Sequence, residues 1–197
     1  QHKNFPDGWR QRESRWKRWT RDDGLPFIET SKPLWDGSNV DRLYVWSEQG
    51  VGDEIMFAST FNELATKSNS LIVACNARLR SLFERSFGDK ITFVSRGKDV
   101  PDEQFDFHAP MLTATGLLRQ HIDDFRSSNT GYLKPAKHVV DSLRKTMLEA
   151  SGGKPIIGMS WLSKNKKVGK KRSISAVDLA SAIPDDFFLV NLQYGDV

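Results

Sequence analysis

Acidic residues and glycines follow a short apolar run near residue 50 of this chain. The run, residues 43–47, is rich in side chains that favour strands, and it predicts a buried parallel strand. Gly50 and Gly52 allow a sharp turn and the close approach of a ligand to the backbone, and Asp53 falls where a helix N-cap is expected. Ligands bind at the carboxyl ends of strands in open α/β sheets, so this turn is the first candidate site.

The acidic side chains of this turn suit two kinds of role. Asp53 fits a general base near an attacking hydroxyl, and it equally fits a cap for the N–H groups of its own helix, worth about 1 kcal/mol. Glu48, at the end of the strand, fits a structural hydrogen-bond acceptor better than a base. The residue types alone leave both roles of Asp53 open.

The surroundings of the turn exclude several other chemistries. A dinucleotide-binding fingerprint needs a third glycine where Ile55 stands and an acidic residue near residues 75–77, where the chain has none. A Walker loop needs Gly-Lys-Ser/Thr after the turn, whereas Asp53 and Glu54 would repel phosphate. The sequence has no Gly-x-Ser-x-Gly elbow of a serine hydrolase and no cluster with metal-ligand spacing, so we expect no metal.

The composition indicates a globular protein with a sizeable core. The chain has 197 residues, 38% of them hydrophobic, and a formal net charge of +4, which permits an anionic small ligand without requiring nucleic acid. Cys75, the single cysteine, lies in the apolar run 71–75 and is expected to be a buried core thiol. Because the chain offers no disulfide framework and no membrane-length apolar run, we expect a cytoplasmic protein without a membrane span.

Strands and helices alternate at short spacing from residue 43 onward. The expected strands are residues 43–47, 70–75, 91–94 and 105–108, and the expected helices are residues 53–67, 77–87, 111–120 and 136–150. Such alternation is typical of an α/β fold with a Rossmann-like, doubly wound parallel sheet.

A domain boundary is predicted at residues 151–155, because two glycines end a helix there and a proline prevents its continuation. The predicted parts are an N-terminal helix and connector at 1–40, a first Rossmann-like domain at 41–150 and the beginning of a second at 151–197. That last part is expected to contain a strand at 155–161, a basic loop at 163–172, a helix at 176–183 and a strand at 187–192.

Tryptophan and arginine crowd the N-terminal segment. Residues 5–20 predict one amphipathic helix with Trp9 and Trp16 on the same face. An aromatic and basic helix could bind nucleic acid, but a docking helix with a solvated charged side is the favoured interpretation. We therefore expect no nucleic-acid partner.

Short motifs along the chain suggest a family. They are Pro-Leu-Trp-Asp-Gly at 33–37, Trp-Ser-Glu-Gln-Gly-Val-Gly-Asp-Glu at 46–54, Phe-Asp-Phe-His at 105–108, Ile-Gly-Met-Ser-Trp at 157–161, Lys-Arg-Ser-Ile at 171–174 and Val-Asn-Leu-Gln-Tyr-Gly at 190–195. In this order they resemble the glycosyltransferase-like domain that follows tetratricopeptide repeats in bacterial proteins. That domain is more distantly similar to ADP-heptose transferases and to O-GlcNAc transferases.

The resemblance implies the glycosyltransferase-B fold, in which a pair of Rossmann-like domains face each other across a cleft. It implies a metal-independent enzyme without a cofactor, which transfers a sugar from a nucleotide sugar to a glycan or protein acceptor. It also implies tetratricopeptide repeats elsewhere in the protein. Since the chain ends soon after the second domain begins, we expect this fragment to be inactive by itself.

The resemblance also assigns roles to individual residues. It implies Asp53 as the catalytic base, with acceptor-side residues Glu48, Gln49, Gly50, Gly52 and His108. The implied contacts of the nucleotide diphosphate are Arg172, Lys171, Gln193 and Gly195. Other interpretations stay open: His108 as an ordinary half-buried histidine, and residues 164–172 as a solvated basic loop. The alternative to an enzyme is a ligand-binding or protein-interaction module with the same fold.

Overall fold

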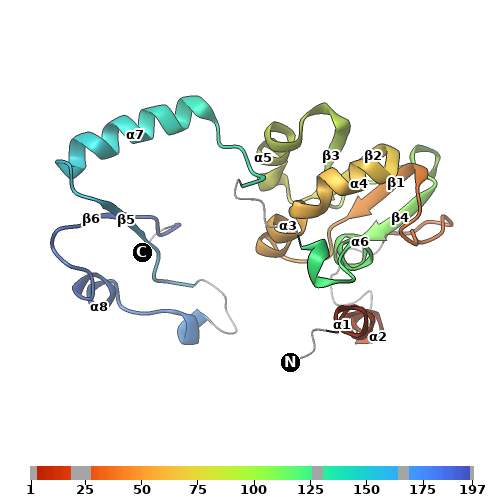
Figure 1. The fold of residues 1–197 in the computed structure, drawn as a ribbon, viewed down its shortest axis with the longest axis horizontal. Helices are drawn as coiled ribbons and strands as arrows, with labels where there is room; N and C mark the ends of the chain where they lie inside the picture. Colours follow the sequence, from red (N-terminus) through yellow and green to blue (C-terminus); the bar gives the residue numbers. More distant parts are fainter. Residues whose placement is uncertain (1–3, 19–27, 126–130, 164–168, 196–197) are drawn as a thin grey trace. The chain divides into compact units, whose positions relative to one another are not determined.

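The chain divides into two compact units, Gln1–Pro135 (unit 1) and Ala136–Val197 (unit 2), shown in Figure 1. The structure, a computed structural model, describes residues 4–18, 28–125, 131–163 and 169–195. Among these residues, no helix has the length and apolar character that crossing a membrane requires.

Unit 1 contains a parallel sheet of four strands in the order β3-β2-β1-β4. The strands are β1 (Val40–Trp46), β2 (Ser68–Cys75), β3 (Ile91–Ser95) and β4 (Phe107–Pro110). Val45 of β1 lies between Val73 of β2 and Ala109 of β4, so the carboxyl ends of the strands meet at one edge. This sheet confirms the predicted Rossmann-like α/β fold, and its strand order reverses between β1 and β4.

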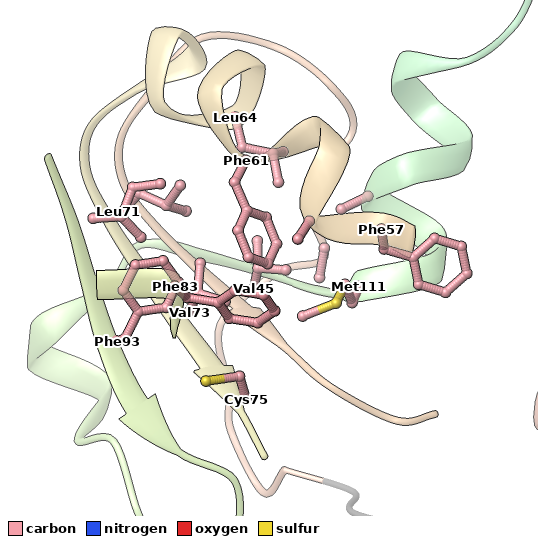
Figure 2. Packing of buried hydrophobic residues seen from close by; sticks show 14 of the residues in the cluster. Val45, Phe57, Phe61, Leu64, Leu71, Val73, Cys75, Phe83, Phe93 and Met111 are labelled. Atoms are coloured by element: carbon pink, nitrogen blue, oxygen red, sulfur yellow. The ribbon is translucent and has the colours of Figure 1, made fainter. Parts of the chain in front are cut away.

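Helices pack on one face of this sheet and form the main core with it. They are α3 (Val51–Phe57), α4 (Phe61–Lys67), α5 (Ala77–Phe87) and α6 (Met111–Leu118). Figure 2 shows Phe61 directed from α4 toward the strand residues Val45 and Val73, and its ring meets that of Phe83 edge-on at 5.4 Å between centroids. Short 3-10 turns are η2 (Ala58–Thr60), η3 (Gly88–Lys90), η4 (Asp102–Gln104) and η5 (Ile122–Asp124). Turn η2 separates α3 from α4, where the sequence predicts one continuous helix.

The opposite face of the sheet carries a smaller apolar cluster. Its buried members are Tyr44, Trp46, Ile72, Ala74 and Phe105. Within the described residues, the side chains packed against this cluster come from α2, from strand β3 itself and from irregular segments, and the β3 to β4 connection contains only the short turn η4. An apolar sheet face must be buried against other elements, and here few elements pack on it, which leaves room for a cavity on this side.

The N-terminal segment forms two short helices, α1 (Phe5–Arg12) and α2 (Arg15–Arg18), where the sequence predicts one. The break at Glu13 lets the two aromatic side chains reach different partners. Trp9 lies against Gly116 of α6, and Trp16 lies against Trp46 with ring centroids 5.8 Å apart. The segment thus docks on α6 and on the sheet within unit 1, in agreement with the docking interpretation.

Unit 2 contains a second parallel strand pair. Its elements are α7 (Lys137–Ser151), β5 (Ile156–Met159), η6 (Gly169–Arg172), α8 (Ala176–Ser181) and β6 (Phe188–Asn191). Gly158 of β5 lies opposite Val190 of β6, so β5, α8 and β6 form a strand, helix and strand unit. The predicted domain boundary at residues 151–155 falls inside unit 2, at the end of α7, and stays a prediction. Residues 164–168 of the predicted basic loop lie outside the described residues.

Candidate functional site

Asp53 lies at the carboxyl edge of the sheet, in the first turn of α3. The N-cap of this helix is Gly50, so Asp53 occupies the third helical position and not the cap position that the sequence predicts. Its Oδ2 accepts a hydrogen bond from the Gly50 N–H at 3.2 Å, and its side chain keeps partial exposure. Asp53 therefore satisfies one N–H group of its own turn, while its role as a base stays a prediction.

Glu48 occupies the point where the strand order reverses, which is where open α/β sheets bind ligands. Its carboxylate accepts hydrogen bonds from the N–H groups of Met111 at 3.0 Å and Leu112 at 3.2 Å, at the start of α6. Arg15 Nη2 lies 3.2 Å from Glu48 Oε1, and only 2% of Glu48 is exposed. Burial raises the pKa of Glu48, against the opposing effects of Arg15 and the N–H donors. This geometry suits a structural acceptor.

Glu54 is a buried acid that sequence reasoning missed. It is 0% exposed, and it accepts hydrogen bonds from the Ser47 hydroxyl at 2.5 Å and the Asn76 N–H at 2.7 Å. Arg96 Nη1 lies 3.6 Å from Glu54 Oε1. Glu54 therefore joins the carboxyl ends of β1, β2 and β3. One signal was present in the sequence, since Glu54 shares a helical face with the apolar residues 57, 58 and 61.

Of the other residues in the turn after β1, Gln49 accepts a hydrogen bond from Arg96, and the two glycines are exposed to solvent. The backbone carbonyl of Gln49 accepts a hydrogen bond from Arg96 Nη1 at 2.6 Å. Gly50 and Gly52 are exposed, and a side chain added at Gly52 would meet open space. Their contacts with an acceptor stay predictions.

His108 is almost fully buried, and one of its ring nitrogens accepts a hydrogen bond. The Trp46 indole N–H donates to His108 Nδ1 at 3.1 Å. Burial lowers the pKa of His108, so the neutral imidazole is favoured. His108, Trp46 and Trp16 also line a small cavity of about 260 Å³.

A larger cavity of about 510 Å³ opens beside the carboxyl ends of β1, β2 and β3. Its lining combines buried residues of the smaller apolar cluster with Ser47 and Arg96, and its rim consists of residues 28–30 and 97–102. Neither Asp53 nor Glu48, the acids of the turn singled out from the sequence, is among the described residues that line this cavity.

The candidate diphosphate contacts lie in unit 2. Lys171 and Arg172 are exposed on η6. The Gln193 side chain is already engaged, since its Oε1 accepts hydrogen bonds from the Trp161 N–H at 3.0 Å and the Leu162 N–H at 2.8 Å. It thereby ties together the segments that follow β5 and β6. Gly195 is exposed and has a left-handed backbone with φ of 80°.

Metal ligation and thiol chemistry find no support among the described residues. No group of three or more His, Cys, Asp or Glu side chains in this part of the chain could hold a metal ion. Cys75 is buried, and burial raises the pKa of its thiol to about 12. This confirms the prediction of a core thiol.

Comparison with known proteins gives one informative match. The chain is similar to Protein FlbA of Caulobacter vibrioides, with 29% identity over 211 residues that cover 96% of this chain. The same match covers 34% of FlbA, so the chain spans about a third of the length of this curated relative. No family model matches the chain, and no solved structure matches it.

Proposed function

We propose that this chain is part of a glycosyltransferase-like domain that transfers a sugar from a nucleotide sugar to a hydroxyl of a glycan or protein. The observation that carries the proposal is the position of Asp53 at the ligand-binding edge of a Rossmann-like sheet. One carboxylate oxygen is held by Gly50, and the other makes no hydrogen bond to any described residue. That second oxygen is available to accept a proton.

In this proposal Asp53 removes the proton of the acceptor hydroxyl as the hydroxyl oxygen bonds to the anomeric carbon of the donor sugar. The bond between that carbon and the diphosphate breaks, and the nucleoside diphosphate leaves with the electron pair. Lys171 and Arg172, which are exposed cations, are the proposed stabilisers of this leaving group. The parallel strand pair of unit 2 supports the proposal, because a second Rossmann-like domain is expected to carry the donor.

The proposal extends to the setting of the domain. We propose a cytoplasmic protein in which tetratricopeptide repeats accompany this domain and present the acceptor to it. The match to only a third of FlbA is compatible with such a larger protein.

A non-catalytic binding module is the second candidate, and Glu48 is the observation that favours it. The start of α6 lies where the strand order reverses, a position that commonly receives an anionic ligand group. Here the carboxylate of Glu48 already accepts the N–H groups of Met111 and Leu112. Because Glu48 already occupies these N–H groups, they are not available to the anionic group of a sugar nucleotide, which favours a non-catalytic module over a transferase.

Release of nucleoside diphosphate from UDP-, GDP- and ADP-sugars distinguishes the two candidates, measured in the protein that contains this chain. Asp53→Asn preserves the size of the side chain and its bond from Gly50, so a base role predicts a fall in turnover of about 100-fold or more. Asp89→Asn, at an exposed acid of η3, is the matched control and should leave turnover unchanged. If no sugar nucleotide is turned over, or if Asp53→Asn is fully active, the binding module becomes the better account.

A further inference from the structure

The guanidinium of Arg96 is fixed through one of its three nitrogens, and the other two have no hydrogen-bond partner among the described residues. The hydrogen bonds and the ion pair that the Arg96 side chain makes to described residues all go through Nη1, which contacts the Gln49 carbonyl at 2.6 Å, Ser47 Oγ at 3.5 Å and Glu54 Oε1 at 3.6 Å. Nε and Nη2 make no hydrogen bond within the described part of the chain, and the residue lines the 510 Å³ cavity. A guanidinium anchored in this way presents fixed donors to an anionic group.

The buried side of the same cavity is apolar and largely aromatic. Tyr44, Trp46 and Phe105 line it, and the rings of Tyr44 and Phe105 lie 5.1 Å apart. The Tyr44 hydroxyl has no hydrogen-bond partner among the described residues, so it can serve a ligand. Flat rings pack well against such side chains, and the cavity volume falls within the range of about 300 to 1,000 Å³ that is usual for small-molecule sites.

The charges of the rim limit how a ligand can lie. Lys98 follows Arg96 closely in the chain and adds a second cation to the lining. The rim also carries acids: Asp102 accepts hydrogen bonds from Thr30 and Ser31, and Glu29 and Asp99 are exposed. The acids repel an anionic group, so such a group is favoured where it contacts the guanidinium of Arg96 directly.

We propose that this cavity binds a small molecule in which a phosphate or carboxylate group is attached to a flat ring, with the anionic group on Arg96 and the ring against Tyr44 and Trp46. The proposal does not depend on sugar transfer, since an enzyme and a binding module could both use the site. Its failure would leave the role of Asp53 untouched, because Asp53 does not line this cavity.

Titration with phenyl phosphate, followed by ¹H–¹⁵N NMR of this chain, tests the proposal. Inorganic phosphate and phenol serve as probes for each half of the ligand. We expect saturable shifts of the Trp46 indole N–H and of the Tyr44 and Arg96 amides, with phenyl phosphate binding at least about 10-fold more tightly than either half, because the two contacts add. Phosphate that binds as tightly as phenyl phosphate, or shifts confined to unit 2, would overturn the proposal.

Substitutions test which side chains of the cavity contact phenyl phosphate. Arg96→Gln should weaken phenyl phosphate binding by about 10-fold or more, and Tyr44→Phe by about 2- to 10-fold, since a charge-assisted hydrogen bond is stronger than a neutral one. Arg80→Gln removes an exposed arginine that pairs with Glu84 on α5, outside the cavity, and should have no effect. Wild-type affinity in Arg96→Gln would refute the site. If that variant does not fold, a wild-type titration in which phenyl phosphate leaves the Trp46 indole N–H and the Tyr44 amide unshifted would refute it instead.

Discussion

Arg15 Nη2 lies 3.2 Å from Glu48 Oε1, and the exposed fractions of the two residues are only 4% and 2%. An enclosed ion pair therefore joins the N-terminal helices to the point where the strand order reverses. Thr113 completes the arrangement, because its hydroxyl accepts a hydrogen bond from the same guanidinium at 2.7 Å. The docked N-terminal segment is thus connected to the candidate site by charge as well as by aromatic packing.

Removal of Arg15 should destabilise the protein strongly. Arg15→Leu leaves the Glu48 carboxylate buried without its counter-charge, and breaking one partner of a buried pair costs about 3 to 5 kcal/mol. Arg12→Leu changes an exposed arginine of the same segment and should alter the free energy of unfolding by no more than about 0.5 kcal/mol. Urea denaturation of both variants measures the difference, and a loss below about 1 kcal/mol for Arg15→Leu would contradict the enclosed pair.

The raised pKa of Glu48 predicts a particular pH dependence of stability. The folded state holds the Glu48 proton more tightly than the unfolded state does, so the group stabilises the fold fully below its ordinary pKa of about 4.3. That contribution is lost as the pH rises toward the folded-state pKa. The advantage of the wild type over Glu48→Gln in free energy of unfolding should therefore shrink from pH 4 upward. An advantage that grows with pH would mean that Arg15 outweighs burial and that the pKa is lowered.

Local signals in the sequence were sufficient for much of the sheet and its helices. Helix α5 has the predicted bounds, because Asn76 accepts from the Arg78 N–H at its start and Gly88, with φ of 70°, ends it. The N-terminal helix was predicted as one piece, since its division at Glu13 depends on contacts with Thr113, 100 residues away in the sequence. Such tertiary contacts cannot be read from periodicity.

The candidate site was only partly predictable for the same reason. The turn after β1 was located correctly, because glycines after an apolar strand are a local signal. Glu54 was missed, because a charged side chain is rarely buried unless paired, and its partners Asn76 and Arg96 follow two other strands. Arg96 was missed as well, since nothing near residue 96 in the sequence indicates that its guanidinium contacts the turn that follows β1.

The neighbours Asp53 and Glu54 should respond differently to loss of charge. Glu54→Gln removes one acceptor oxygen and the counter-charge of Arg96 from a fully buried position, so we expect a loss of about 2 to 3 kcal/mol in free energy of unfolding. Asp53→Asn keeps an acceptor for the Gly50 N–H and should cost less than about 1 kcal/mol. Chemical denaturation gives both values, and hydrogen exchange at the Asn76 amide should accelerate only in Glu54→Gln. Equal losses in the two variants would show that the burial of Glu54 is not what holds the strand ends together.

The contact between Trp9 and Gly116 should make any side chain at position 116 costly. A Cβ there would lie 3.2 Å from ring atoms of Trp9, whose indole N–H is fixed by a hydrogen bond to the Arg119 carbonyl. Gly116→Val therefore forces the indole, and α1 with it, away from α6, at a cost of about 1 to 3 kcal/mol. The matched control is Gly8→Val on α1, where an added Cβ meets nothing within 4 Å and the change should stay within about 0.5 kcal/mol. Denaturation reports the energies, and the Trp9 indole N–H resonance reports the displacement: a resonance unmoved in Gly116→Val would show that α1 does not dock through this contact.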